Sequence, residues 1–209
     1  MTNLPPPPEL LKRAQALAVL DLILSPEWDF RYYSFNSQWS AGEMMASMRN
    51  GCGDEWWILF HDSGWAALKG LAHESPAWSE GGEALSQALQ SACPAELRDF
   101  ASEPAFRWDS TSFCYFWNPT TAAWVRANDL TPFAHLDAGE AGLPDHLIGT
   151  AEDYQNFARD YFEAEAPLEI IRGVFAHKTV DSGMVTTLNP DIDLDDIEEE
   201  LLHEIEYGV

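Results

Sequence analysis

The sequence predicts an α+β fold, in which an antiparallel meander sheet is packed by several helices and the C-terminal third is helical. Two observations carry this prediction. Short apolar and aromatic segments alternate with turn sequences in the first half of the chain, and helical periodicity dominates after residue 150. The 209 residues are 46% hydrophobic and 12% aromatic, which suffices for a packed core and excludes a chain that is disordered throughout.

Four short segments predict the meander, with turn sequences at 50–53 and 62–64. The segment 43–49 is ambiguous, because Met44, Ala46 and Met48 alternate with polar residues as in a strand, whereas Ser40 and Glu43 have the spacing of a helix capping box. We interpret it as a strand, since a turn and a further strand follow. The segment 55–60 is apolar on both faces, so we expect it to be covered on both sides. The expected strands span residues 30–35, 43–49, 55–60 and 65–71.

Helices and one hairpin account for the rest of the chain. Residues 113–117 and 123–126 predict a hairpin around the turn 118–120. The segment 168–174 fits a strand or a helix, and this alternative stays open. The final helix has an apolar stripe and an almost wholly acidic opposite face. The expected helices span residues 9–24, 82–92, 95–101, 150–162 and 194–205.

The domain organisation is expected to be simple. Residues 1–8 end in four prolines and form a flexible lead-in, and residues 9–209 form a single α+β domain with a sub-boundary near 130–148. The most apolar stretch, 14–24, is too short to span a bilayer and contains Asp21. The three widely spaced cysteines predict no disulfide framework, which favours a cytoplasmic location.

The charge balance excludes some partners. Eleven Lys and Arg face 35 Asp and Glu, giving a net charge of −24, which argues against binding of nucleic acid and of anionic membranes. The last twenty residues hold nine carboxylates and no Lys or Arg. This acidic end is either a solvated face or a docking surface for a basic protein. In the second interpretation Glu198, Glu199 and Glu200 are the candidate binding residues.

Motifs for metals, cofactors and nucleophiles are weak or absent. The series Asp191, Asp193, Asp195 lacks the glycine and the final glutamate of a calcium loop. His73 and Glu74 match no metal-binding spacing, and we expect no metal and no cofactor. Cys52 lies between two glycines, where it is exposed and reactive or simply tolerated in a turn.

Aromatic residues are unusually dense, with nine tryptophans in the chain. Both faces of one sheet can be packed by them, and the functional alternative is a stacking platform or a protein-binding groove. Trp39 and Trp78 are the candidate binding residues of this kind.

Several short motifs resemble those of a family of uncharacterised bacterial proteins, over most of the chain from about Tyr32 to Tyr207. The motifs are Ser34-Phe-Asn-x-x-Trp39, Met45-Ala-Ser-Met-Arg49 with Gly51-x-Gly-Asp-Glu55, Lys69-Gly-Leu-Ala-His-Glu-Ser-Pro76 and Leu188-Asn-Pro-Asp-x-x-Leu194. This resemblance implies no activity and no catalytic residue. In its succession of strands and helices the chain is more loosely similar to acidic immunity proteins of the SMI1/KNR4 group.

Two hypotheses of function follow. The first is a protein-interaction module, of an immunity or inhibitor type, whose acidic C-terminal half binds a basic partner such as a toxin or nuclease. The second is an enzyme or small-ligand-binding protein with a pocket near His73 and Glu74, where His73 is an acid or base and Arg49 holds an anion.

Overall fold

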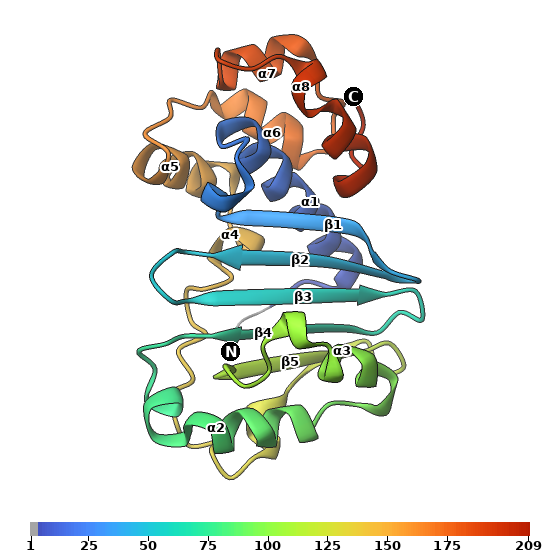
Figure 1. Cartoon of the computed structure of the whole chain (residues 1–209), viewed down its shortest axis with the longest axis vertical. Helices are drawn as coiled ribbons and strands as arrows, with labels where there is room; N and C mark the ends of the chain where they lie inside the picture. Colours follow the sequence, from blue (N-terminus) through green and yellow to red (C-terminus); the bar gives the residue numbers. More distant parts are fainter. Residues whose placement is uncertain (1–3) are drawn as a thin grey trace.

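A six-stranded antiparallel sheet forms the centre of the computed structural model, which describes residues 4–209 (Figure 1). The strands lie in the sheet in the order of the sequence, which confirms the predicted meander and the α+β class. The ambiguous segment 43–49 is a strand that pairs on both sides. The strands are β1 (Tyr33–Ser40), β2 (Glu43–Arg49), β3 (Glu55–His61), β4 (Ala66–Leu71), β5 (Phe113–Asn118) and β6 (Ala123–Arg126).

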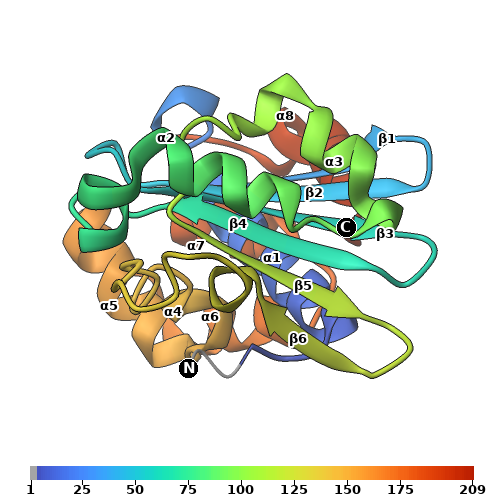
Figure 2. The same ribbon diagram turned by 90° about the horizontal axis from the view of Figure 1, so that it is seen from below.

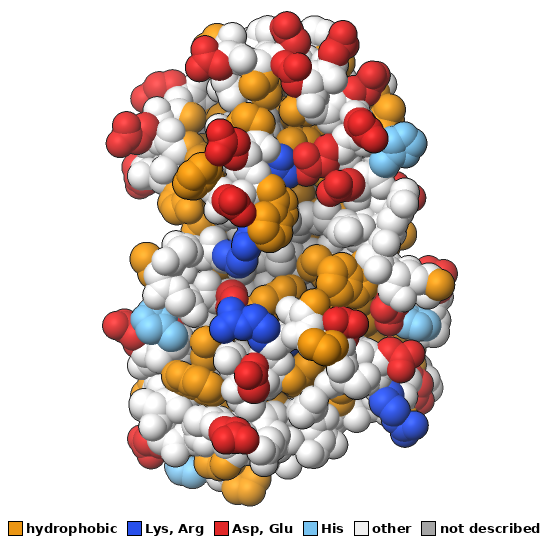
Figure 3. Space-filling model, viewed as in Figure 1, with side chains coloured by type: hydrophobic (Ala, Val, Ile, Leu, Met, Phe, Trp, Pro, Cys, Tyr) orange, Lys and Arg blue, Asp and Glu red, His pale blue; other side chains and the backbone are white. Residues whose placement is uncertain are grey.

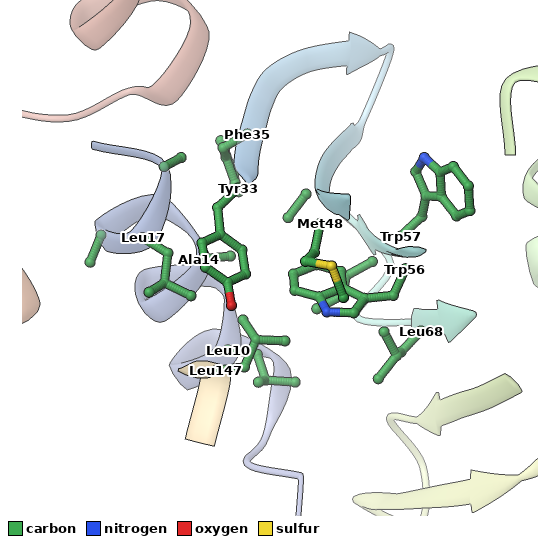
Figure 4. Packing of buried hydrophobic residues seen from close by; sticks show 14 of the residues in the cluster. Leu10, Ala14, Leu17, Tyr33, Phe35, Met48, Trp56, Trp57, Leu68 and Leu147 are labelled. Atoms are coloured by element: carbon green, nitrogen blue, oxygen red, sulfur yellow. The ribbon is translucent and has the colours of Figure 1, made fainter. Parts of the chain in front are cut away.

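One face of the sheet packs against helix α1 (Pro7–Leu24), which lies below the sheet in Figure 2. Proline at the first helical positions suits a helix start, because the missing N–H would have no intrahelical partner there. In Figure 4, Tyr33, Met48 and Trp56 lie on the α1 side of the sheet, near Leu10. Trp57 points to the other side, so β3 is covered on both faces as predicted.

A buried carboxylate ties α1 to β1 and to the C-terminal helices. Asp21 is fully buried, and its Oδ2 accepts the backbone N–H groups of Tyr32 and Tyr33 at 3.0 and 2.7 Å. Its Oδ1 accepts the hydroxyl of Tyr154 at 2.6 Å. Burial raises the pKa of Asp21 to about 7 even though these donors lower it.

The opposite face carries α2 (Pro76–Ser91) and α3 (Arg98–Ser102), which lie above the sheet in Figure 2. The side chain of Ser75 caps α2 by accepting the N–H of Trp78. After α3, a 3-10 turn over Pro104–Phe106 brings Phe106 against Phe100, with ring centroids 4.5 Å apart. In Figure 1 these elements cover the lower part of the sheet on this side and leave β1 and β2 largely uncrossed by helices.

The C-terminal helices gather beyond the β1 edge (Figure 1). The side chains of Ser37 and Gln38 donate to the carbonyl of His203 and join β1 to the last turn. These helices are α5 (Ala151–Tyr161), α6 (Leu168–Phe175), α7 (Ser182–Leu188) and α8 (Leu194–Glu199), which continues into a π-helical turn (Glu200–Ile205). The segment left open at 168–174 is therefore helical. The short helix α4 (Asp145–Ile148) lies behind the strands on the α1 side, where Leu147 is near Leu10 (Figure 4).

Some predicted boundaries are wrong for physical reasons. The expected strand at 30–35 begins only at Tyr33, because Trp28–Phe30 form a 3-10 turn and Arg31 donates to the carbonyls of Ser25 and Pro26. Helix α2 begins at Pro76 rather than Gly82, which lies inside it as a kink with φ of 46°. The helical periodicity of 150–162 places Tyr161 on the apolar face of α5, where the residue is 43% exposed.

The buried hydrophobic residues form one cluster that extends from Leu4 to Tyr207. Both sides of the sheet and the C-terminal helices contribute to it. Among residues 4–209, no helix has both the length and the apolar character that a membrane crossing requires.

Candidate functional site

The sheet face opposite α1 is hollowed between the C-terminal helices and α3, and Lys and Arg side chains gather in the middle of this face (Figure 3). Strand register places Arg49 opposite Glu55 and Trp57 opposite Lys69, on this same face. Arg107, after the 3-10 turn Pro104–Phe106, completes the group. We call Arg49, Glu55, Lys69 and Arg107 the charged cluster. Three of the eleven Lys and Arg of this very acidic chain therefore lie around one carboxylate.

Arg107 is the exposed member of the charged cluster, Arg49 is half-buried and Glu55 is buried. The Arg49 guanidinium lies against the ring of Trp28, with 3.9 Å between its central carbon and the ring centroid. Glu55 is 7% exposed, and its Oε2 accepts from Nη1 of Arg107 at 3.1 Å. Burial raises the pKa of Glu55, while the charges of Arg107, Lys69 and Arg49 oppose that shift.

Lys69 lies beneath them and is fully buried. Its Nζ donates to the carbonyls of Phe106 and Arg107, the second at 3.0 Å. The same nitrogen lies 4.5 Å from the ring centroid of Trp57. Burial lowers the pKa of Lys69 to about 7, against the opposing effect of Glu55. This lysine fixes the backbone of Arg107, a non-glycine residue with φ of 46°.

The sequence named Arg49 and missed the other three members of the cluster. A lysine in the middle of the apolar segment 65–71 was a signal for Lys69, because an isolated charge is rarely buried without partners. Glu55 is the first residue of an apolar strand, and no pattern in the sequence indicates that its side chain is buried. Arg107 lies 52 residues from Glu55, so no local pattern connects the two.

His73 and Glu74 follow the end of β4, whose last residue, Leu71, pairs with Glu55. His73 Nδ1 is 2.7 Å from Oδ1 of Asp54, which also accepts the His73 backbone N–H. These hydrogen bonds lower the pKa of Asp54 although its partial burial opposes them. Glu74 is exposed, with its carboxylate 3.9 Å from His73 Nε2. In the described part of the chain, no hydrogen bond or ion pair joins Arg49 to His73 or Glu74, so a pocket containing all three stays a prediction.

The candidate acidic residues differ in their surroundings. Glu198 and Glu199 are exposed, whereas Glu200 is half-buried and forms an ion pair with Arg31. Partial burial and the neighbouring carboxylate of Glu200 raise the pKa of Glu204. Asp193 and Asp196 form the capping box of α8, which agrees with a role at the helix start and not in a calcium loop.

The two candidate tryptophans are half-buried. Trp39 packs against Phe106 with ring centroids 5.2 Å apart and lines a pocket of ≈ 370 Å³ with Glu43 and Glu103. Trp78 lies in the first turn of α2. The structure thus places neither in the charged cluster, although Trp39 contacts the turn that precedes Arg107.

A cavity of ≈ 300 Å³ beside the charged cluster is lined by Arg107 together with Glu103 and Asp109. A pocket of ≈ 480 Å³ is lined by Pro6–Pro8, Leu11, Trp65 and Trp117. Another of ≈ 600 Å³ contains His146, whose pKa is lowered by burial, with Asp145, Asp153 and Asp160. Within residues 4–209, no three His, Cys, Asp or Glu side chains are arranged to hold a metal ion. Cys52 is exposed, as its turn position suggested.

Comparisons with known proteins found no match for this chain. No protein-family model matches the chain, and neither a curated protein nor a solved structure matches it. Two surfaces of the structure are candidates for function: the acidic C-terminal helices and the charged cluster.

Proposed function

We propose that the chain is a protein-interaction module that binds a basic partner protein through its C-terminal helices. One observation carries this proposal: a dense set of exposed carboxylates borders two exposed aromatic side chains. We call the carboxylates the acidic surface. Its exposed members are Asp191, Asp193, Asp195, Asp196, Glu198, Glu199, Glu204 and Glu206.

The aromatic side chains are those of the 3-10 turn Trp28–Phe30. Trp28 is 54% exposed and Phe30 is 65% exposed, which is unusual for large rings in a chain with so extensive a core. The ion pair between Arg31 and Glu200 holds this turn beside the last helix. Exposed aromatic residues beside a charged rim are typical of the anchor residues of protein interfaces.

Electrostatics favours a basic partner over other macromolecules. Residues 190–209 contain no Lys or Arg, so the field of the acidic surface is not neutralised within this segment. Such a field accelerates encounter with a basic protein and makes the association sensitive to salt. It repels nucleic acid, whose phosphates carry the same sign.

The proposal also names the class of basic protein that binds. We choose a basic toxin or nuclease as the partner, because neutralising such a protein requires an acidic surface and no catalytic apparatus. The acidic surface is held rigidly, because Ile197, Leu201 and Ile205 are buried beneath it.

The test is affinity capture at low and at moderate salt with the wild-type chain and with Glu198→Gln/Glu199→Gln. A stoichiometric basic partner is expected at low salt and is expected to dissociate as salt rises. The double variant should weaken its affinity about threefold or more, because two exposed charges leave the interface. Glu200 is left unchanged, since its replacement would break the ion pair with Arg31.

The matched control is Glu80→Gln/Glu96→Gln, which removes the same charge from two exposed positions of the α2–α3 region. In Figure 1 this region lies at the opposite end of the molecule from α8. If both double variants weaken the affinity equally, the effect is one of net charge and the proposed contact surface is wrong. If neither variant weakens it, the acidic surface does not bind the partner.

A further inference from the structure

The charged cluster contains two polar atoms that lack a partner. Among the described residues, Nη2 of Arg49 and Oε1 of Glu55 are the buried side-chain nitrogen and oxygen atoms without a hydrogen bond. They belong to residues that face each other in the register of β2 and β3. Buried polar atoms are nearly always paired in folded proteins, so an unpaired donor and an unpaired acceptor at adjacent positions require an explanation.

The surrounding contacts hold both groups in place. Glu55 cannot turn freely, because it is 7% exposed and its other carboxylate oxygen accepts from Arg107. The Arg49 guanidinium is held against Trp28 instead of forming a hydrogen bond with the carboxylate opposite. Arg107 is itself fixed through its carbonyl, which accepts from Lys69. Such support is typical of a preorganised binding site.

The balance of charge indicates the chemistry of a ligand. The guanidinium groups of Arg49 and Arg107 accompany the one carboxylate of Glu55, so the cluster has an excess of positive charge even when Lys69 is neutral, within a chain of net charge −24. An arginine with a free N–H recognises an oxyanion, and a carboxylate oxygen without a partner needs a donor. Large polyanions are excluded, because the rest of the acidic chain repels them.

We propose that the charged cluster binds a small carboxylate or phosphate that carries a hydroxyl or amino group. Its oxyanion would accept from Nη2 of Arg49 and its hydroxyl or amino group would donate to Oε1 of Glu55. Trp28, with half of its surface exposed, lies over the guanidinium and borders the ligand. Arg107 stabilises the anion at longer range and orients Glu55. The site shares Trp28 with the proposed protein interface, but its ligand-binding groups on Arg49 and Glu55 are not part of the acidic surface.

The test uses four probes with the full-length chain, read by the thermal midpoint and by tryptophan fluorescence. Glycerate and 3-phosphoglycerate carry both an oxyanion and a hydroxyl group, acetate carries the oxyanion alone, and glycerol carries hydroxyls without charge. The first two are expected to raise the midpoint and to change the tryptophan emission of the chain, and the last two are expected to do so much more weakly.

Two variants locate the binding site. Arg49→Gln should weaken binding of glycerate and 3-phosphoglycerate about tenfold or more, because a charge-assisted hydrogen bond is lost. Glu55→Gln should reduce the preference for these probes over acetate, since the amide does not present a charged acceptor. The control is Arg98→Gln, an exposed arginine on α3, which should leave binding unchanged.

Three results would overturn the proposal. The first is that neither glycerate nor 3-phosphoglycerate changes the midpoint or the fluorescence of the wild-type chain at millimolar concentration. The second is that Arg49→Gln, shown by circular dichroism to be folded, binds the probes as the wild type does. The third is that acetate binds as tightly as glycerate, because Oε1 of Glu55 then has no role. The fluorescence of the wild-type chain decides the first point even where a variant fails to fold.

Discussion

Asp21 and Lys69 are both fully buried, on opposite sides of the sheet, and their hydrogen-bond partners differ. On the α1 side, Asp21 has three donors, which come from β1 and from α5. On the open side, Lys69 has two carbonyl acceptors and the ring of Trp57. Burial shifts the pKa of both groups to about 7, from below for Asp21 and from above for Lys69.

The difference lies in the neighbours of the two groups. Every hydrogen bond of Asp21 joins elements that must come together in folding, namely α1, β1 and α5. Lys69 instead supports Arg107, and the cluster above it keeps two buried polar atoms unpaired. The buried carboxylate on the α1 face is thus fully paired, while the open face retains two unpaired polar atoms, whose cost the proposed ligand would offset.

The largest expected effect is that of Asp21→Ala. It leaves two buried N–H groups and the hydroxyl of Tyr154 without their acceptor, so the free energy of unfolding should fall by about 3–5 kcal/mol. Urea denaturation followed by tryptophan fluorescence measures this. The control is Asp21→Asn, which keeps an oxygen acceptor and should cost much less. Equal losses for the two variants would show that the charge, and not the hydrogen bonds, matters.

The pH dependence of stability is the second prediction, and the two groups have opposite signs. The folded-state pKa of Asp21 is raised, so its contribution is fully present below about pH 4 and is lost as the pH rises to about 7. The folded-state pKa of Lys69 is lowered, so its contribution is lost as the pH falls from about 10 to about 7. Together they predict a minimum in their summed contribution near pH 7.

This minimum is measured by urea denaturation of the wild type and of two variants at several pH values, and the free energies of unfolding are compared at each pH. Asp21→Asn should remove the slope between about pH 4 and 7, and Lys69→Met should remove the slope between about pH 7 and 10. Identical pH profiles for the wild type and both variants would contradict the assignment of these slopes to the two buried groups.

Lys69→Met should cost about 1–3 kcal/mol of the free energy of unfolding, less than Asp21→Ala. The methionine keeps the apolar contact with Trp57, and the two carbonyls that lose their donor lie in the turn beside the open face. Denaturation in urea at pH 7 measures the loss, with the exposed Lys12→Met as the matched control. A loss as large as that of Asp21→Ala would show that both faces depend equally on their buried charge.

The same contrast explains how far the sequence could predict the molecule. The meander followed from the apolar segments and the turn sequences between them, and the final helix followed from the periodicity of Ile197, Leu201 and Ile205, which are buried. The start of β1 did not, because it depends on Asp21, which lies 12 residues before Tyr33. The π-helical turn after Glu199 likewise had no local signal.

The candidate sites divide in the same way. The acidic surface is contiguous in the sequence, so composition alone indicated it. The charged cluster comes from three strands and a distant turn, and only Arg49 was named in advance. Pairing of Arg49 with Glu55 is a property of strand register, which a sequence without its structure does not specify.

The smallest expected effect concerns the contact between Trp28 and Arg49 at the border of the open face. A double-mutant cycle of Trp28→Ala and Arg49→Met should give a coupling energy of about 0.5–1 kcal/mol in urea denaturation, the range of an exposed cation–π pair. A second cycle of Phe30→Ala with Arg49→Met is the control and should be additive, because no contact joins Phe30 to Arg49 in the described residues. Coupling in both cycles would mean that the turn Trp28–Phe30 acts as one packed unit. Coupling in neither would mean that Trp28 does not hold Arg49 in solution, and that the unpaired Nη2 is free to turn toward Glu55.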